Sequence, residues 1–246
     1  MHDTKAGGTP YDQAFYDSFE ETSLRSAQVV VPAVMKWAQP RSVVDVGCGL
    51  GIWLSVFGEH GVTEVLGLDG DYVERRRLRI PQECFRPTQL AAPPALGRTF
   101  DLAMSLEVAE HLPPDSSERF ADFLASLAPV LLFSAAIPGQ PGTAHINPRP
   151  HRYWHEAFAK RGYRALDPLR PVLWHDERVS LHYRQNVFIY ARTDWLEADA
   201  RAQALRAAPA ANCLTLIDEG VLADNISLGA SLRRLPGQLA RRLMGR

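Results

Sequence analysis

The stretch that decides the fold is SVVDVGCGLGIW, residues 42–53. A short apolar run that carries one acid, Asp45, leads into three glycines at alternate positions, Gly47, Gly49 and Gly51. An apolar run of this length bounded by glycines is typical of a buried strand, and the residues after it have the apolar spacing of a helix. Glycine at a strand end allows a sharp turn and lets a ligand reach the main chain. Because open parallel sheets bind ligands at the carboxyl ends of their strands, the stretch predicts a ligand site here.

The same alternation of strands and helices continues along the chain. Further strands are predicted at TEVLGLDG, CFRPTQL, FDLAMSLE and PVLLFSAAIPG, and two late ones at YRALDPLR and RQNVFIYAR. A helical pattern precedes them over residues 14–37, and an Ala-rich helical pattern follows Arg192. Strands that alternate with helices favour a parallel sheet covered on both faces, which is an α/β fold.

The composition fits a globular chain and argues against several classes of protein. The 246 residues suffice for one α/β domain with additions, and the net charge of -1 provides no field that would favour nucleic acid. Cys48, Cys84 and Cys213 show neither a zinc spacing nor a disulfide pattern, which suits a reducing cytoplasm. The chain begins without the apolar core of a signal peptide, and its apolar stretches are too short to span a bilayer. We therefore expect a cytoplasmic protein without a transmembrane segment.

The acid and the glycine spacing narrow the choice of ligand. The spacing is GxGxG rather than the GxGxxG of dinucleotide-binding proteins, and Asp45 stands where it would repel a pyrophosphate. A carboxylate there suits a cationic ligand, such as an ammonium group beside a sulfonium. Asp69, at the tip of the next predicted strand, is placed to accept from ribose hydroxyls, and Gln89 follows the third strand, where an adenine edge would lie. The alternative is a tight turn in which Asp45 only caps backbone N–H groups.

Three motifs together carry a family resemblance. VVDVGCGLGIW, LGLDGD and FDLAMSLEVAEHL, in this order within residues 40–192, resemble the class I S-adenosylmethionine-dependent methyltransferases. The resemblance implies a Rossmann-like, seven-stranded, mostly parallel sheet with helices on both faces and an antiparallel last strand. It also implies S-adenosylmethionine as the cofactor. It divides the chain into N-terminal lid helices (residues 1–40), a cofactor-binding methyltransferase core (41–192) and a C-terminal helical extension (193–246).

The resemblance further assigns residues to the parts of the cofactor. Asp45 and the glycine loop would hold the methionine part, and Asp69 would hold the ribose. Gln89 and Leu90 would lie against adenine, where many relatives carry an acid. The implied cofactor-binding residues, which include one in the leading helix and one at the tip of the fourth strand, are Tyr16, Asp45, Gly47, Gly49, Gly51, Asp69, Gln89, Leu90 and Glu107.

A second candidate group follows the fourth strand. In SLEVAEHLPPD, Glu107, Glu110 and His111 would share one face if a helix begins at the strand tip. This E-x-x-E-H spacing resembles the ubiquinone-pathway O-methyltransferases and the small-RNA 2′-O-methyltransferases. That resemblance implies a divalent metal held with a further side chain from GTAHINPRPH, first His145 and second His151. Mixed carboxylate and imidazole ligands suit zinc, manganese or iron. We prefer the alternative, a hydrogen-bonded network without a metal.

These residues lead to a predicted reaction. Methyl transfer to an alcohol requires that the hydroxyl lose its proton, which a histidine or a metal can bring about. His111 and His145 would approach the pocket from neighbouring strand ends and are the predicted catalytic residues. We expect methylation of a hydroxyl on a small molecule or glycan, in a bacterial specialised-metabolite or sugar pathway. The alternatives are an RNA 2′-hydroxyl, a nitrogen or a carbon as acceptor, and a non-catalytic cofactor-binding scaffold. A homodimer is left open.

The late part of the chain is rich in aromatic residues and histidines. Trp154 and Phe158, four residues apart, predict the buried face of an amphipathic helix. Trp174 and Tyr183 are candidates to stack on a sugar or ring of the acceptor. The late histidines fit a surface position: His151, His155, His175 and His182.

Overall fold

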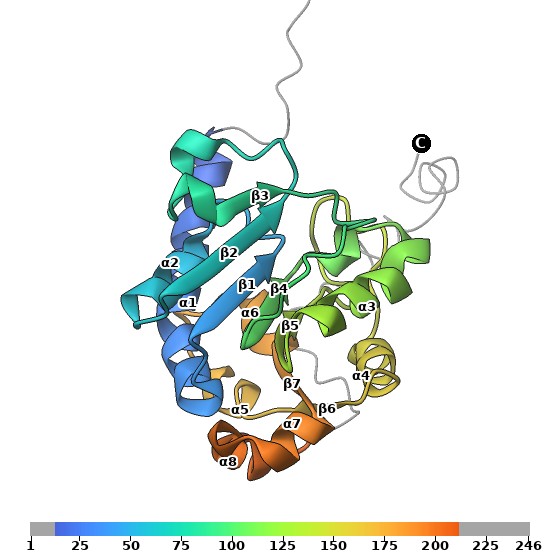
Figure 1. Ribbon diagram of the computed structural model, residues 1–246. Coiled ribbons are helices and arrows are strands. Elements are labelled where there is room, and N and C mark those ends of the chain that lie inside the picture. Colours follow the sequence, from blue (N-terminus) through green and yellow to red (C-terminus); the bar gives the residue numbers. More distant parts are fainter. Residues whose placement is uncertain (1–12, 212–246) are drawn as a thin grey trace, which may run out of the picture.

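The computed structural model describes the backbone of residues 13–211 and the side chains from residue 20 onward. The predicted role of the Tyr16 side chain, Cys213 and the part of the C-terminal extension after residue 211 lie outside this described part. Figure 1 shows a twisted central sheet with helices packed on both of its faces.

Seven strands form the central sheet, in the order β3-β2-β1-β4-β5-β7-β6. Neighbouring strands pair in parallel, except that β7 runs antiparallel to both β5 and β6. The strands are β1 (Ser42–Val46), β2 (Glu64–Asp69), β3 (Phe85–Pro87), β4 (Leu102–Leu106), β5 (Val130–Ser134), β6 (Tyr163–Leu166) and β7 (Phe188–Arg192). The predicted seven-stranded, mostly parallel sheet with an antiparallel last strand is therefore confirmed.

Helices cover the sheet from both sides (Figure 1). They are α1 (Gln13–Ala38), α2 (Ile52–Glu59), α3 (Ser117–Leu127), α4 (His151–Ala159), α5 (Arg170–Leu173), α6 (Leu181–Asn186), α7 (Thr193–Ala198) and α8 (Gln203–Arg206). Successive strand residues point to opposite faces, so Val43 and Leu102 pack with α1, α2 and the late helices, while Val44 and Ala103 pack with α3 and α4. None of the helices in the described part is long and apolar enough to cross a membrane.

The strand register brings the predicted site residues to one edge of the sheet. Asp45 of β1 lies opposite Gly67 of β2 and Met104 of β4. Asp69 at the end of β2 lies opposite Pro87 of β3. The carboxyl ends of β1, β2, β3 and β4 therefore lie together. From β1 the chain crosses to β2 on one side, and β4 lies on the other side of β1. This divergence of connections is the place where open α/β sheets bind ligands.

The segment after β4 differs from the prediction. The helix expected to begin at Glu107 is replaced by two single 3-10 turns, η3 (Ala109–His111) and η4 (Pro114–Ser116), ahead of α3. Glu107 itself has a φ of 54°, which is a left-handed conformation that no α-helix contains. The prediction that its side chain shares one helical face with Glu110 and His111 was therefore wrong. The positions of the Glu107, Glu110 and His111 side chains are set by the turn after β4 instead.

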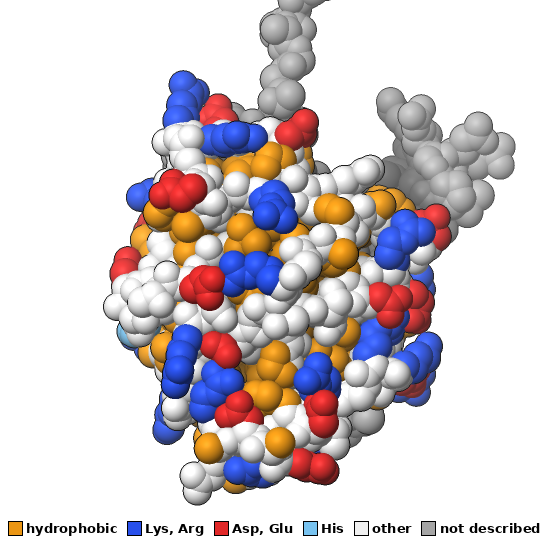
Figure 2. Space-filling model, in the orientation of Figure 1, with side chains coloured by type: hydrophobic (Ala, Val, Ile, Leu, Met, Phe, Trp, Pro, Cys, Tyr) orange, Lys and Arg blue, Asp and Glu red, His pale blue; other side chains and the backbone are white. Residues whose placement is uncertain are grey.

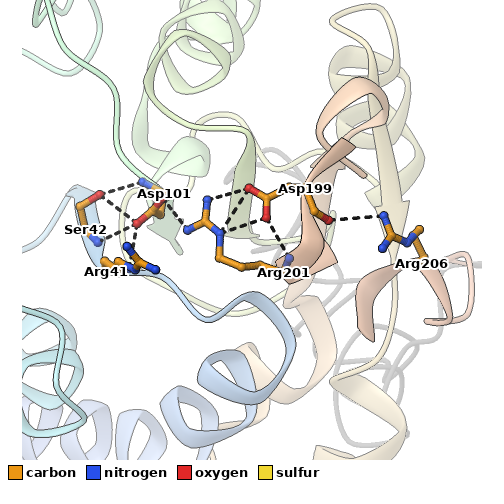
Figure 3. A network of polar contacts seen from close by, with 6 residues as sticks. All are labelled: Arg41, Ser42, Asp101, Asp199, Arg201 and Arg206. Atoms are coloured by element: carbon orange, nitrogen blue, oxygen red, sulfur yellow. Dashed lines mark hydrogen bonds and ion pairs between the residues drawn. The ribbon is translucent and has the colours of Figure 1, made fainter. Parts of the chain in front are cut away.

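The C-terminal helices are anchored at the opposite edge of the sheet, where β1 and β4 begin (Figure 3). Asp101 accepts a hydrogen bond from the Arg41 amide at 2.8 Å and pairs with Arg201 at 2.7 Å. Arg201 also pairs with Asp199 at 2.8 Å, and Arg206 donates to the Leu196 carbonyl at 2.6 Å. The Ala-rich segment predicted as one helix is thereby folded into three short pieces, α7, η5 (Ala200–Ala202) and α8, against the base of the core.

Candidate active site

A cavity of about 1220 Å³ opens at the carboxyl edge of the sheet. Its walls come from the loop after β1, the ends of β2 and β3, the turn after β4, and two helices far apart in sequence, α1 and α6. A cavity of this size is ample for a drug-sized or nucleoside ligand. Among the predicted residues that line it are Asp45, Gly47, Gly49, Asp69, Gln89, Leu90, Glu107 and His111.

The glycine loop has a conformation that other residues adopt only with strain. Gly47 has a φ of 92°, and a Cβ at this position would stand 2.3 Å from a methyl of Val108. Gly49 has a φ of 52°, and the space beside it is open for 4 Å. The loop therefore uses one glycine to pack against the turn after β4 and another to leave the main chain bare toward the cavity.

The Asp69 carboxylate binds this loop to the end of β2. It accepts hydrogen bonds from the Gly49 amide at 2.7 Å, the Gly70 amide at 2.7 Å and the Tyr72 hydroxyl at 2.5 Å. Tyr72 was not singled out from the sequence, because an exposed tyrosine in a turn carries no spacing signal. Burial and the bond to Asp69 hold the pKa of Tyr72 above its usual range, so the phenol stays a donor.

Asp45 provides a second buried carboxylate beside Asp69. Only 3% of it is exposed, and burial, together with the nearby Asp69, raises its pKa well above the ordinary value. The alternative that Asp45 caps the loop amides is not what the structure shows. The amides of Gly47 and Cys48 donate to the Leu68 carbonyl at 2.7 and 3.2 Å, and the Gly49 amide donates to Asp69. A cation bound at this end of the cavity would offset the repulsion between the two acids and favour the ionised form of Asp45.

The loop after β3 forms the cavity wall next to the end of β2. The Thr88 amide donates to the Asp69 carbonyl at 2.6 Å, which fixes this loop next to the end of β2. Gln89 and Leu90 follow and line the cavity. The structure thus brings the residues predicted for adenine to the same cavity as the residue predicted for ribose.

Glu107 is held by two side-chain amides that were not predicted. One carboxylate oxygen accepts from Gln140 Nε2 at 2.7 Å, and the other accepts from Asn186 Nδ2 at 3.2 Å. Asn186 Nδ2 also donates to Gln140 Oε1 at 2.7 Å, so the three side chains form a closed set. His151, the second candidate metal ligand, lies behind this set with Nε2 3.0 Å from Asn186 Oδ1.

Glu110, His111 and His145 form a separate cluster. One potential ligand atom of each lies within 4.8 Å of the other two, and the two imidazole rings are 5.1 Å apart. The Glu110 carbonyl accepts from the amides of Ile146 and Asn147 at 3.0 and 2.9 Å, which draws the loop carrying His145 to the turn after β4. His145, the first candidate for a further ligand, is therefore in the cluster, whereas His151, the second candidate, is not.

The Glu110 carboxyl group is the most unusual member of the cluster. Only 1% of Glu110 is exposed, and within the described residues neither carboxyl oxygen has a hydrogen-bond partner. Burial and the nearby Glu107 raise its pKa to about 9. Burial and His111 lower the pKa of His145, which keeps that imidazole neutral at pH 7.

The donor set fits a divalent cation in part. A buried carboxyl group without a hydrogen bond, next to two imidazoles, is a combination that zinc, manganese or iron would accept. Glu107 does not complete the set, because both of its oxygens already accept amide hydrogens. Among the described residues, three side chains therefore offer ligands, and further positions would fall to water or substrate.

The late aromatic residues and histidines divide between the core and the site. Trp154 and Phe158 are buried as predicted, at 2% and 0% exposure. The surface position expected for His151 and His155 was wrong, because both are buried against the aromatic core around Phe188. Tyr183 lines the cavity beside the cofactor residues. Its helix comes so late in the chain that no local pattern linked it to the glycine loop.

Comparisons with known proteins identify a methyltransferase domain and a shared fold. Residues 25–136 match the family model described as a methyltransferase domain. Similar solved structures include a sugar N-methyltransferase from a Streptoalloteichus species, with 17% identity, 78% of this chain and 99% of that chain covered, and a TM-score of 0.55. An amino pentose methyltransferase from Micromonospora echinaspora has 17% identity, coverage of 76% and 100%, and a TM-score of 0.52.

A third similar structure is an O-methyltransferase family protein from Burkholderia thailandensis. It has 16% identity and a TM-score of 0.54, and the match covers 74% of this chain and 60% of that chain. This chain therefore spans well under two thirds of the length of that protein. At these identities the structural likeness concerns the fold.

Proposed function

Since this chain contains a class I S-adenosylmethionine-dependent methyltransferase domain, we propose that it transfers the cofactor methyl group to a hydroxyl group of a small molecule or glycan. The observation that carries this proposal is the position of the Glu110–His111–His145 cluster. It lies next to the cofactor cavity, and His111 belongs to both. An acceptor hydroxyl at that junction would meet a proton acceptor and the methyl group together.

The proposed cofactor site is supported by its charge and by the open main chain of the glycine loop. When bound, S-adenosylmethionine supplies the methyl group and its own leaving group. Asp45 and the clamped Glu107 face the cationic methionine end, and Asp69 faces the ribose. A carboxylate has about four lone-pair sites, so Asp69 retains capacity for a ribose hydroxyl beside its present bonds. Tyr72, the donor of one of these bonds, is 78% exposed.

The proposed acceptor site is supported by two adjacent imidazoles, those of His111 and His145. A hydroxyl becomes a good nucleophile when a base takes its proton during the transfer. His145 is neutral at pH 7 because burial lowers its pKa, and His111 stands next to it at the mouth of the cavity. We assign the proton-accepting role to this pair, and the alignment of acceptor and methyl to the walls around them.

The surface supports a small acceptor rather than a nucleic acid. Figure 2 shows Lys and Arg interspersed with Asp and Glu over the described part of the face in view, instead of one continuous basic stripe. Proteins that bind nucleic acid gather positive charge on one surface. The net charge of -1 agrees with this.

The test is the identity of the methylated product. The protein is incubated with methyl-labelled S-adenosylmethionine and fractionated extracts of bacteria that make glycans and specialised metabolites, and labelled products are identified by mass and fragmentation. Asp69→Ala protein is the matched control for enzyme-dependent label. A labelled O-methyl ether supports the proposal. An N-methyl or C-methyl product would overturn the assignment of a hydroxyl acceptor but not the methyltransferase activity.

A metal-assisted version of the reaction is the second candidate. It is favoured by one observation, the buried Glu110 carboxyl group that lacks a hydrogen bond among the described residues. Glu110, His111 and His145 would hold the ion, which would acidify the acceptor hydroxyl. Elemental analysis of the purified protein, before and after dialysis against a chelator, separates this version from the metal-free network.

A further inference from the structure

We propose that Tyr183 positions the methionine end of the cofactor by donating a hydrogen bond to its carboxylate group. The inference rests on the proposed use of S-adenosylmethionine and adds a residue that neither the motifs nor the comparisons assign. It begins from a charge problem in the cavity. The methionine end of the cofactor is a zwitterion, and the acids Asp45 and Glu107 suit only its positive groups.

Tyr183 is the neutral donor that the chain places beside these acids. It lines the cavity and is 6% exposed. Asp45 and Glu107 line the same cavity. Burial raises the pKa of Tyr183 to about 12, so the phenol keeps its proton at neutral pH. A donor that stays protonated beside these acids is suited to hold an anionic group there.

The Tyr183 side chain is surrounded by residues of two other helices. The Trp53 ring of α2 stands edge-on to the tyrosine ring with centroids 5.0 Å apart. Ser23 of α1 lines the same cavity. The tyrosine ring is thus held in place before the ligand arrives.

The helix that carries Tyr183 is fixed to the leading helix. The Ser180 amide, just before α6, donates to Ser26 Oγ of α1 at 2.9 Å, and Ser26 in turn donates to the Thr22 carbonyl at 2.8 Å. Asn186, at the end of the same helix, holds Glu107. The short helix α6 therefore positions both the Glu107 carboxylate, through Asn186, and the Tyr183 phenol. We pair the carboxylate with the positive groups of the cofactor and the phenol with its negative group.

The test compares three ligands by titration calorimetry. S-adenosylmethionine and S-adenosylhomocysteine both carry the amino acid carboxylate, whereas 5′-methylthioadenosine lacks the amino acid part. Tyr183→Phe keeps the ring against Trp53 and removes the hydroxyl. We expect it to weaken binding of the first two ligands about tenfold, the loss typical of a hydrogen bond to a charged group, and to leave the third within twofold.

Tyr190→Phe is the matched control. Tyr190 is a buried tyrosine whose hydroxyl lies 2.7 Å from His155 Nδ1, behind the sheet and away from the cavity lining. Its loss should leave all three affinities within twofold. If Tyr183→Phe is misfolded by circular dichroism, Tyr183→Met replaces it, because it also removes the hydroxyl, and we expect the same ligand pattern.

The outcomes separate this inference from the proposed function. Equal loss for all three ligands, or no loss for any, would overturn the role of Tyr183. A carboxylate-dependent loss in Arg77→Met but not in Tyr183→Phe would assign that role to Arg77, which also lines the cavity and pairs with Glu20. Wild-type protein that binds none of the three ligands would instead contradict the proposed function.

Discussion

Asp69 and Gly49 are joined by a hydrogen bond of 2.7 Å, from the glycine amide to the carboxylate at the end of the neighbouring strand. The bond links the two features that were predicted separately, the glycine loop after β1 and the acid after β2. It means that Asp69 shapes the loop as well as facing the ligand. Substitutions at Asp69 therefore report on both roles.

Asp69→Ala should weaken binding of S-adenosylmethionine by about 10- to 100-fold, because the ribose loses a charged acceptor and the Gly49 amide loses its partner. Calorimetry measures the affinity, and thermal unfolding shows whether the fold persists. Asp71→Ala is the control, since this neighbouring carboxylate is exposed and should change the affinity less than threefold. Equal affinities for wild-type and Asp69→Ala protein would remove Asp69 from the ribose site.

Two glycine-to-alanine substitutions should have opposite effects on stability. Gly47→Ala forces a side chain into a φ of 92° and against Val108, so we expect a loss of about 2 kcal/mol or more in the free energy of unfolding. Gly58→Ala lies within α2 with open space around it, and it should gain about 0.5–1 kcal/mol. Urea unfolding measures both. Similar effects from the two substitutions would contradict the conformation assigned to the loop.

The sequence predicted those parts of the site that depend on local pattern. Asp45, the glycines and Asp69 stand at strand ends, and strand ends follow from short apolar runs bounded by turn residues. The register of a parallel sheet then brings them together. The fold and the cofactor edge were therefore within reach of sequence reasoning.

The rest of the site depends on contacts between distant segments. Gln140 and Asn186 reach Glu107 from 33 and 79 residues away, and an amide in a loop or a short helix has no spacing that marks it. The helix expected after β4 is absent for a different reason. The pattern E-x-x-E-H fits a helix, but Pro113 and Pro114 limit the length of an α-helix that begins before them. The left-handed conformation of Glu107 separates its side chain from the cluster.

Arg201→Met should make the free energy of unfolding less dependent on pH in the acid range. The bond to Arg201 lowers the pKa of Asp199 to about 2, and the same guanidinium, with the Arg41 amide, outweighs burial and lowers the pKa of Asp101. Depressed carboxyl pKa values stabilise the fold above about pH 4, and this contribution is lost as pH falls through the folded values. The variant should therefore lose about 1 kcal/mol near pH 7 and less near pH 2.

Unfolding in urea at pH 7, 4 and 2 measures this difference. The control is Arg178→Met, whose partner Asp176 forms an ion pair in which the arginine is 71% exposed. Exposed pairs of this kind contribute little, so its curves should follow those of the wild type. A constant difference between Arg201→Met and wild type at all three pH values would show that packing, and not the ion pairs, anchors the C-terminal helices.

Glu110→Gln should stabilise the chelator-treated protein at alkaline pH. Burial, and then the nearby Glu107, raises the pKa of Glu110 to about 9, so the folded protein keeps this carboxyl protonated while the unfolded chain ionises it above about pH 4.5. Stability from this group therefore falls as pH rises from about 5 through 9. Glutamine never ionises, so the variant should gain about 1–3 kcal/mol over wild type near pH 8 and little near pH 5.

Thermal unfolding between pH 5 and 9 in the presence of a chelator tests this expectation. Glu156→Gln is the control, because that side chain is 66% exposed on α4 and should leave the pH profile unchanged. Parallel profiles for wild type and Glu110→Gln would mean that Glu110 is already ionised in the folded protein, and a cation or a hydrogen bond would then have to accompany it.

His111→Ala and His145→Ala should abolish most methyl transfer while leaving the cofactor bound. Each removes one of two imidazoles whose ring centroids are 5.1 Å apart and of which His111 lines the cavity, so we expect turnover to fall at least about 100-fold, the usual effect of losing a general base. The dissociation constant for S-adenosylmethionine should stay within threefold. His175→Ala, at an exposed position, should retain normal turnover. The same assay in chelator then separates the two mechanisms, because full activity in metal-free protein requires the imidazoles alone, whereas activity that returns only with zinc, manganese or iron requires the ion.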